Sequence, residues 1–469
     1  MWIGGSPVRA AASQVVELPF DGSPVGEVFR GTREHVDAAV RAAAQAFPAM
    51  REMSREDRAS ILRRAHQKLR DSLEHFAHLI SSESGKPIKE ARLEADRAAW
   101  TLLFSAEEAH RLAGEVVPLD AHPGGRNRWA MTIREPLGVI AAITPFNFPL
   151  NLSMHKIGPA LAAGNTVVHK PATTTPLSAL ALVQLFEESG LPPGALNVVT
   201  GPGGEIGDAF VTHPGIAMVT FTGSPEVGVR MRSLAGMKRV TLELGNNSAV
   251  IIEPDANLDA AIPRCVTGAF AHSGQVCISV QRIFVNENIR SEFTDRFLAA
   301  TGKLTLGHPH DPSTDISSLI TIPEAERVEH WIAEATSAGA RLLAGGQRRR
   351  ATITPAVLAD APETVSLSCR EAFGPVVTIN SYAHLDDAIA SINRSDYGLQ
   401  AGIYTRDLDR AFHAARRVHV GGFMINEVPQ YRVDNMPYGG VKLSGSGREG
   451  PRYAIEEMTE PKLITWNVS

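Results

Sequence analysis

The feature that most restricts the fold of this chain is an alternation of short apolar runs with helical stretches, which begins near residue 137. Before residue 222 the apolar runs read as buried strands at 138–143, 166–169, 196–200 and 218–221, with helices between them such as 177–189. A second series extends from about residue 240 to 426, with strands expected at 249–252, 283–285 and 376–379 and helices at 258–271 and 323–338. This alternation predicts α/β architecture with parallel sheets wrapped by helices, and such sheets bind ligands beyond the carboxyl ends of their strands.

The length and composition exclude several other classes of protein. A chain of 469 residues is too long for one hydrophobic core, so two or three domains are expected. A net charge of −5 without any run of Lys and Arg argues against a nucleic-acid partner. Apolar runs are too short to span a bilayer, and the N-terminus lacks the features of a signal peptide, so we expect no membrane partner and a cytoplasmic location.

The three cysteines, Cys265, Cys277 and Cys369, suit a reducing compartment, because their number and spacing fit neither a disulfide framework nor a zinc site. We therefore expect no metal. Cys265 lies on an expected helix and is interpreted as a core residue. A lone free cysteine is most often a buried packing residue, so only the sequence around it can single one out for chemistry.

The N-terminal region reads as helical. Helices are expected at 33–50, at 54–84 and at about 88–113. Ser54 has the pattern of an N-cap, and Gly85 and Gly114 are expected to end the second and third helices.

Three motif matches are discounted. Gly445-x-Gly447-x-x-Gly450 fits a dinucleotide fingerprint but follows no expected strand, so it is interpreted as a glycine-rich turn. Ser153-x-x-Lys156 lacks the companion motifs of a β-lactamase. His308-Pro-His310 has no third ligand in view.

The informative cysteine is Cys277, in the sequence Gly274-Gln-Val-Cys277 at the end of an expected helix. Glycine there lets the backbone approach a ligand closely. This segment resembles the nucleophile motif of the aldehyde dehydrogenase superfamily. Thr241-Leu-Glu243-Leu-Gly245, which places Glu243 34 residues before Cys277, resembles that family's glutamate motif.

Four further motifs follow the family's order. They are Thr144-Pro145-Phe146-Asn147-Phe-Pro149, Phe221-Thr-Gly223-Ser224 followed by Gly228, Glu371-Ala-Phe373-Gly-Pro375, and Met436-Pro-Tyr438-Gly-Gly with Lys442 and Ser444-Gly445. The resemblance covers essentially the whole chain. Within the family, the sequence is most similar to the lactaldehyde, phosphonoacetaldehyde and semialdehyde dehydrogenase branch.

The resemblance implies an aldehyde dehydrogenase fold with a Rossmann-like cofactor-binding domain, an α/β catalytic domain and a small β oligomerisation element. The expected parts are a cofactor-binding domain (1–118 and 139–240), an oligomerisation hairpin (119–138), a catalytic domain (241–428), a return loop at the active site (429–451) and an oligomerisation tail (452–469). Residues 128–133 alternate as an exposed strand would, and such an edge needs a partner. We therefore expect a homodimer or homotetramer.

The expected chemistry is oxidation of an aldehyde to a carboxylic acid. Cys277 would attack the carbonyl as thiolate, giving a thiohemiacetal that loses hydride and becomes a thioester. The resemblance assigns the base to Glu243 and the oxyanion donor to Asn147. Lys156 would support the asparagine or a proton relay, although it could also be a solvated lysine.

The cofactor implied is NAD or NADP. A helix that begins at Gly223-Ser224 would bind pyrophosphate with its N-terminal N–H groups. In the family, Glu371 holds the nicotinamide ribose and Lys170 contacts the adenosine ribose or its phosphate. Thr173 replaces a glutamate of many NAD-preferring relatives, so NADP should be tolerated. The same motifs place Thr144, Pro145, Phe146, Gly245 and Phe373 at the cofactor.

The substrate residues expected are His155, Tyr438 and Arg432. His155 stands where a bulky aromatic often lines the substrate tunnel, and Arg432 should lie near its mouth. A cation there would suit a short aldehyde with a carboxylate, phosphonate or sulfonate, although Arg432 could equally form a salt bridge at a subunit contact. Arg282 is interpreted as structural, and Asn246 departs from the family's usual glycine.

Two alternatives stay open. One is a dehydrogenase that passes the acyl group to coenzyme A, although such relatives typically lack the glutamate found here at Glu243. The other is a non-catalytic scaffold on the same fold, whose signature would be loss of the nucleophile that Cys277 supplies.

Overall fold

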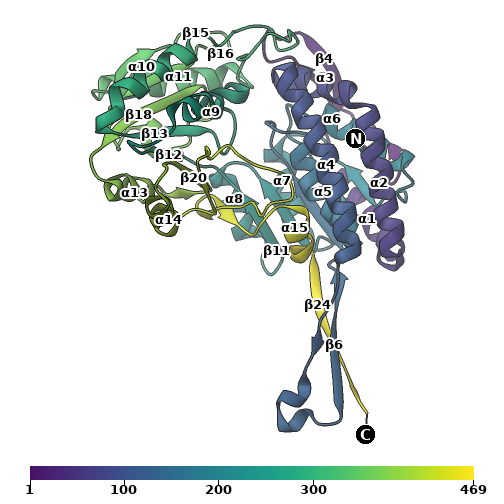
Figure 1. Cartoon of the computed structure of the whole chain (residues 1–469). Coiled ribbons are helices and arrows are strands. Elements are labelled where there is room, and N and C mark those ends of the chain that lie inside the picture. Colours follow the sequence, from purple (N-terminus) through teal and green to yellow (C-terminus); the bar gives the residue numbers. More distant parts are fainter. Residues whose placement is uncertain (469) are drawn as a thin grey trace.

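The computed structural model describes residues 1–468, and two large sheets organise the chain (Figure 1). The first sheet has eight strands in the order β2-β1-β9-β8-β7-β10-β11-β23. Its five central strands are parallel: β9 Leu196–Val198, β8 Thr166–Lys170, β7 Val139–Ile143, β10 Met218–Thr222 and β11 Arg239–Glu243. Antiparallel strands flank them, namely β1 Trp2–Ile3 with β2 Ser6–Pro7 on one side and β23 Gly445–Ser446 on the other.

The second sheet has seven strands in the order β14-β17-β18-β13-β12-β20-β21. All but β14 run parallel. The strands are β14 Arg341–Ala344, β17 Ala356–Ala359, β18 Val376–Tyr382, β13 Val280–Asn286, β12 Ser248–Ile252, β20 Gln400–Tyr404 and β21 Gly422–Ile425. The apolar runs in the sequence predicted strands in both sheets, because a parallel strand covered on both faces is apolar throughout.

The helices at the N-terminus pack against the first sheet. They are α1 Arg33–Glu52, α2 Arg55–Asp71, α3 Leu73–Ser84 and α4 Ile88–Arg111. The expected single helix over 54–84 is wrong, because the chain breaks at Ser72, where φ is −106° and ψ is 18°. Ser and Asp compete with the helix for backbone hydrogen bonds, and Asp71-Ser72 supplies both. Ser54 caps α2 through the Asp57 amide, and Gly85 ends α3 with φ of 71°, as predicted.

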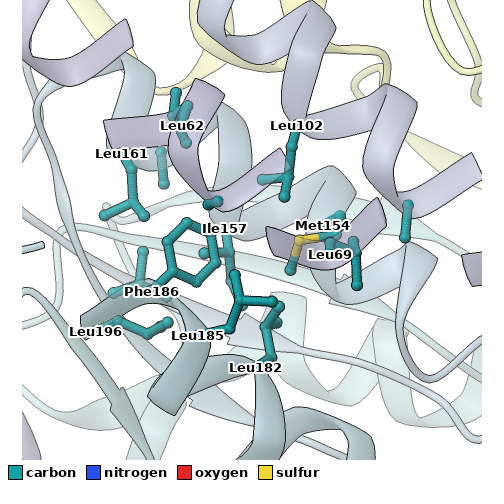
Figure 2. Packing of buried hydrophobic residues seen from close by; sticks show 14 of the residues in the cluster. Leu62, Leu69, Leu102, Met154, Ile157, Leu161, Leu182, Leu185, Phe186 and Leu196 are labelled. Carbon is teal, nitrogen blue, oxygen red and sulfur yellow. The ribbon is translucent and has the colours of Figure 1, made fainter. Parts of the chain in front are cut away.

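A large core lies between α2, α3 and α4 and one face of the first sheet. Figure 2 shows leucines of α2 interleaved with Leu102 of α4 and with side chains of α5 Asn151–Ala163 and α6 Leu177–Glu188. Removing one such leucine side chain would cost about 2–5 kcal/mol. On the opposite face, α1, α7 Gly203–Thr212 and α8 Pro225–Leu234 enclose a second cluster.

The second sheet has its own helices and its own cores. These helices are α9 Leu258–Phe270, α10 Arg290–Thr301, α11 Ile322–Ser337, α12 Ser366–Cys369, α13 Leu385–Asn393 and α14 Leu408–Arg417. Short paired strands complete the fold: β3 Ser13–Glu17 with β4 Pro24–Phe29, β15 Arg348–Arg349 with β16 Thr352–Ile353, and β19 Tyr397–Gly398 with β22 Val441–Lys442.

A long two-stranded arm projects from the body of the molecule (Figure 1). It pairs β6 Arg128–Pro136 with β24 Thr459–Asn467, and β5 Val116–Val117 joins the far side of β6. Trp129 and Trp466 stack on each other at 6.5 Å and are both exposed. β24 is thus an edge strand with apolar side chains, of the kind that proteins normally cover. None of the helices within residues 1–468 is long and apolar enough to cross a bilayer.

The chain crosses between the two halves twice near their interface. β11 continues in the first sheet to Glu243, so the expected domain boundary between residues 240 and 241 falls inside this strand. The chain then enters the second sheet at Ser248 and later returns to the first at Gly445, beside α15 Pro451–Glu457. The crossing segments contain Gly245, Arg432 and Tyr438 of the site residues expected from the sequence.

Candidate active site

Most of the expected site residues lie at the carboxyl ends of the parallel strands of the first sheet. Asn147 follows β7, Lys170 ends β8, Gly223 follows β10 and Glu243 ends β11. These four strands are neighbours in the sheet, so residues from distant parts of the sequence meet at one edge. This edge is where open α/β sheets bind their ligands.

Cys277 lies in a tight loop between α9 and β13. His272, Ser273 and Gly274 adopt left-handed backbone conformations in succession, with φ of 48°, 54° and 73°. A Cβ at Gly274 would overlap the carbonyl oxygen of Gly374, so the loop packs directly against the segment that contains Glu371. The Cys277 Sγ lies 2.9 Å from the Tyr438 Oη.

The surroundings of Cys277 keep its thiol protonated at neutral pH. Burial raises the pKa of the Cys277 thiol to about 12, while the Tyr438 hydroxyl and the Arg432 charge lower it. The carboxyls of Glu371 and Glu243 act in the raising direction. A thiol in this setting becomes a nucleophile only if a neighbouring group removes its proton.

Glu243 is a buried carboxyl without a hydrogen-bond partner. Neither of its oxygens has a partner within residues 1–468, and its side chain is 3% exposed. Burial and the nearby Glu449 carboxylate raise the pKa of Glu243 well above its usual value. A Cβ at Gly439 would come within 2.8 Å of Glu243 Oε1, so the return loop closes over this carboxyl. Such a group can accept a proton readily, as a general base must.

Glu449 is a site residue that sequence analysis missed. It accepts hydrogen bonds from Lys156 Nζ at 2.9 Å and from Arg432 Nη2 at 3.1 Å. Burial would raise the pKa of Glu449, but the charges of Lys156 and Arg432 outweigh it and lower the pKa to about 2. The signal was present in the sequence, because Glu449 lies inside the glycine-rich match 445–450 that was interpreted as a surface turn.

Asn147 is tied to the nucleophile loop. Its Nδ2 donates to the carbonyl oxygen of Gln275 at 2.9 Å, two residues before Cys277. An amide nitrogen carries two N–H groups, so one of them is left for another acceptor. Lys156 does not contact Asn147 but donates to Thr220 Oγ1 at 3.2 Å in addition to Glu449. Of its two expected roles, this position favours the proton relay.

Arg432 lies deeper than the expected tunnel mouth. Its side chain is 6% exposed, and its guanidinium stacks 3.6 Å above the centre of the Tyr438 ring. It is paired with Glu449 of the same chain, and its Nη2 lies 3.0 Å from His155 Nε2. Its Nε is buried and has no partner among the described residues. Through Tyr438, the cation therefore belongs to the immediate surroundings of the Cys277 thiol.

His155 is fully buried and is tied to the return loop. Its Nε2 lies 2.9 Å from the Asp434 Oδ1, and burial together with Arg432 lowers the pKa of His155. The imidazole is therefore neutral at pH 7. Asp434, which sequence analysis also missed, keeps a strongly lowered pKa despite burial because His155 and Arg97 surround it.

Glu371 and Phe373 lie opposite the first sheet. Glu371 Oε1 accepts from the Asn246 backbone N–H at 2.9 Å, and a Cβ at Gly245 would come within 2.6 Å of its Oε2. Burial raises the pKa of Glu371 to about 8. Phe373, with φ of 47°, packs edge-on against Phe146 at 5.8 Å between ring centres. These contacts hold the segment of Glu371 and Phe373 against Asn246 and Phe146.

The other end of the expected cofactor site contains an unpaired cation. Lys170 is 4% exposed, and its pKa is lowered to about 8 by burial. Within residues 1–468 it donates only to the Pro171 carbonyl oxygen, at 3.2 Å. Thr173 Oγ1 donates to the Gly201 carbonyl oxygen at 3.3 Å. Ser224, directly after Gly223, caps the N-terminus of α8, which starts at Pro225. Thr144 and Pro145 follow β7 directly, and Thr144 Oγ1 lies 3.0 Å from Nε2 of His169 in β8.

The residues that sequence analysis set aside lie elsewhere or are structural. Cys265 is buried in the second-sheet core, and burial raises its pKa. Arg282 Nη2 donates to the Asn247 carbonyl oxygen, as a structural residue would. His308 and His310 pack against each other, and no group of three or more potential metal ligands was found within residues 1–468.

Comparison with known proteins gives a consistent result. The model of the aldehyde dehydrogenase family matches residues 8–464. A 3-sulfolactaldehyde dehydrogenase of Priestia aryabhattai is 47% identical over 468 residues, which cover 100% of this chain and 98% of that protein. A lactaldehyde dehydrogenase of Methanococcus aeolicus is 39% identical, with full coverage of both chains.

A solved structure has the same fold. It is a glyceraldehyde-3-phosphate dehydrogenase of Methanocaldococcus jannaschii complexed with NADP, 36% identical, with a TM-score of 0.94 over 98% of this chain and 100% of that one. The fold class and the branch expected from the sequence are thereby confirmed.

Proposed function

The chain belongs to the aldehyde dehydrogenase family, and on that premise we propose that it oxidises a short anionic aldehyde to a carboxylic acid through a thioester on Cys277, with NAD or NADP. One observation carries the proposal. The Cys277 thiol contacts the Tyr438 hydroxyl, the Arg432 guanidinium lies over the Tyr438 ring, and the buried Glu243 is close enough for its charge to act on the thiol.

The first steps use groups of this chain. Glu243 takes the thiol proton, directly or through water, and the Cys277 thiolate adds to the aldehyde carbon. The carbonyl oxygen becomes an oxyanion, which accepts hydrogen bonds from the free N–H of Asn147 and from the Cys277 backbone. One such donor contributes about 3–4 kcal/mol to the stability of the transition state. Collapse of this thiohemiacetal expels hydride and leaves the acyl group as a thioester on Cys277.

Hydrolysis then completes the reaction. Glu243 accepts a proton from water, which attacks the thioester, and the carboxylic acid leaves as the thiol re-forms. The charges of Lys156 and Glu449 act on Glu243, and in this proposal the pair receives its proton through water. A raised pKa helps Glu243 to accept a proton from the Cys277 thiol and from water, because its proton affinity then lies closer to theirs.

The bound dinucleotide supplies the hydride acceptor, and the residues present fit it. The α8 N-terminus offers backbone N–H groups to a pyrophosphate. Glu371 has an oxygen facing Gly245, where only glycine leaves space, and this oxygen can accept from ribose hydroxyls. Lys170 has no carboxylate partner within residues 1–468, so a 2′-phosphate would give this cation its counter-charge.

The charge of the buried network favours an anionic substrate. Contacts between its members connect three cations and two anions: Arg97, Lys156, Arg432, Asp434 and Glu449. One positive charge is therefore left over among these five paired side chains. A carboxylate, phosphonate or sulfonate would neutralise it, and guanidinium binds such groups through paired hydrogen bonds. The sulfolactaldehyde and glyceraldehyde-3-phosphate relatives are named for anionic aldehydes.

The arm of β6 and β24 supports assembly. An exposed edge strand that carries Leu463, Ile464 and Trp466 is best covered by a second copy of the chain, and we therefore propose a homodimer or homotetramer. The low cysteine count suits a reducing cytoplasm.

The test is reduction of NAD and NADP, followed at 340 nm, on pairs of aldehydes that differ only in an acidic head group. Turnover without coenzyme A, faster on the anionic member, is the expected result. Turnover only with coenzyme A would favour the acyl-transferring alternative. Absence of turnover under both conditions would contradict an enzymatic function.

A further inference from the structure

Helix α4 covers the core mainly with small apolar side chains but also buries one charge, because Glu94 is 1% exposed. Carboxylates are almost never fully buried unless they are paired. Glu90 and the partly exposed Arg97 lie at helical spacing from Glu94, and Lys86 lies just before the start of the helix. We call these four residues the α4 polar stripe.

Glu94 fixes the segment that contains Asn147. Its Oε1 accepts hydrogen bonds from the backbone N–H groups of Leu150 and Asn151, at 2.9 and 3.2 Å. These groups begin α5, which has no side-chain cap of its own, so Glu94 supplies the cap from a different helix. Its other oxygen forms an ion pair with Lys86.

Lys86 and Glu90 reach the nucleophile loop. The Lys86 ammonium lies 3.7 Å from the centre of the Phe148 ring, and that ring packs against His272 at 6.3 Å. Burial raises the pKa of Glu90 to about 7, and the His272 backbone lowers it. His272 begins the left-handed turn that leads to Cys277, so this end of the stripe contacts the turn through Phe148.

Arg97 fixes the return loop. Its guanidinium binds both oxygens of Asp434, at 3.0 and 2.8 Å. Asp434 also accepts from Asn151 Nδ2 at 3.0 Å, and it lies two residues after Arg432. One carboxylate thus connects α4, α5 and the loop that contains the expected substrate cation.

We propose that the α4 polar stripe is a positioning device that aligns Cys277, Asn147 and Arg432, although none of its members touches the reacting atoms. The three residues lie in segments that are far apart in the sequence, and α4 contacts all three segments. Displacement of one segment by about 1 Å can lower a rate about a hundredfold. The role of each member in catalysis rests on the proposed function.

The test compares Glu94→Gln and Arg97→Met with Glu107→Gln, a control on the exposed face of α4. Active sites are counted by labelling Cys277, and kcat and KM are expressed per labelled site. Glu94→Gln should lower kcat on all aldehydes by about tenfold or more and leave the KM for NAD(P) unchanged. Arg97→Met should raise KM about tenfold on anionic aldehydes alone. Arg97→Lys should restore part of this loss, and Glu107→Gln should match the wild type.

A second readout needs no turnover. Iodoacetate is anionic and iodoacetamide is neutral, and both alkylate Cys277. Arg97→Met should lower the ratio of the two alkylation rates, because Arg432 loses its alignment. The partly exposed Arg97 makes this variant usable even if Glu94→Gln does not fold.

The outcomes separate the two proposals. Equal kcat and KM per labelled site in every variant, with an unchanged alkylation ratio, would overturn the positioning role. A wild type that turns over no aldehyde would contradict the proposed function, and the alkylation ratio would then decide the positioning role alone.

Discussion

Two buried polar regions lie side by side in this protein and differ in how their hydrogen-bonding capacity is met. Around Cys277, both oxygens of Glu243, the Asn147 Oδ1 and the Arg432 Nε have no partner within residues 1–468. In the α4 polar stripe, Glu94 accepts hydrogen bonds from the Lys86 ammonium and from two backbone N–H groups. An unsatisfied buried polar group destabilises a fold by about 1–3 kcal/mol. The difference indicates that the region around Cys277 is arranged for chemistry and the region around Glu94 for rigidity.

The largest expected effect is on the nucleophile. Cys277→Ala should lower dehydrogenase activity by more than about 10⁴-fold, because no thioester can form. Turnover at 340 nm and circular dichroism of the same sample check this result. Substitution of the buried Cys265 by Ala is the matched control and should leave most of the activity. Comparable activity in both variants would remove Cys277 from the mechanism.

The comparison itself is tested by stability. Glu94→Ala breaks a buried ion pair and leaves the Lys86 charge unpaired, so it should lower the free energy of unfolding by about 3–5 kcal/mol. Glu243→Gln removes no hydrogen bond and should leave stability unchanged or raise it. Urea unfolding of both variants measures the two changes in the free energy of unfolding. Equal losses would mean that the two regions do not differ.

Glu243→Gln should lose activity although it keeps its stability. Loss of the base should lower kcat by about 10²–10⁴-fold, the usual contribution of general base catalysis. Steady-state kinetics on the folded variant measure this effect. Retention of full activity would assign the base to another group.

The pH dependence of Cys277 follows from its raised pKa. With a thiol pKa of about 12, the thiolate fraction falls as pH is lowered and rises about tenfold for each pH unit up to that value. Alkylation of Cys277 by iodoacetamide should therefore rise steadily between about pH 6 and 9. A plateau that begins below pH 7 would show a thiolate stabilised in the resting enzyme.

The smallest effect concerns the unpaired cation at Lys170. Thr173→Glu places a carboxylate near the expected site of the 2′-phosphate and should raise the KM for NADP about tenfold relative to that for NAD. Separate titrations with the two cofactors measure the ratio. An unchanged ratio would place the 2′ position elsewhere.

Much of the fold was predictable because its signals are local. The apolar runs at 139–143 and 218–222 are buried parallel strands, and Gly85 ends a helix with positive φ. The break at Ser72 escaped prediction because the apolar spacing continues across it. The assignment of Cys277 and Glu243 to catalysis followed from motifs and stays a prediction.

The residues that escaped prediction are those whose partners lie far away in the sequence. Glu94 caps α5 from another helix, Asp434 binds Arg97, and Glu449 joins Lys156 to Arg432. Each is an ordinary charged residue in its own segment. Only the folded chain reveals that its charge is buried, which is why Arg432 was expected at a tunnel mouth.

The most direct test of the account is intact-mass spectrometry of the Glu243→Gln variant after incubation with NAD(P) and an anionic aldehyde. Water is a weaker acid than the Cys277 thiol, so loss of the base should slow hydrolysis more than acylation. The account therefore predicts a mass increase equal to one acyl group on Cys277 and one NAD(P)H formed per site. The same treatment of Cys277→Ala should give neither. An unmodified Cys277 in a variant that still reduces the cofactor would contradict the thioester route.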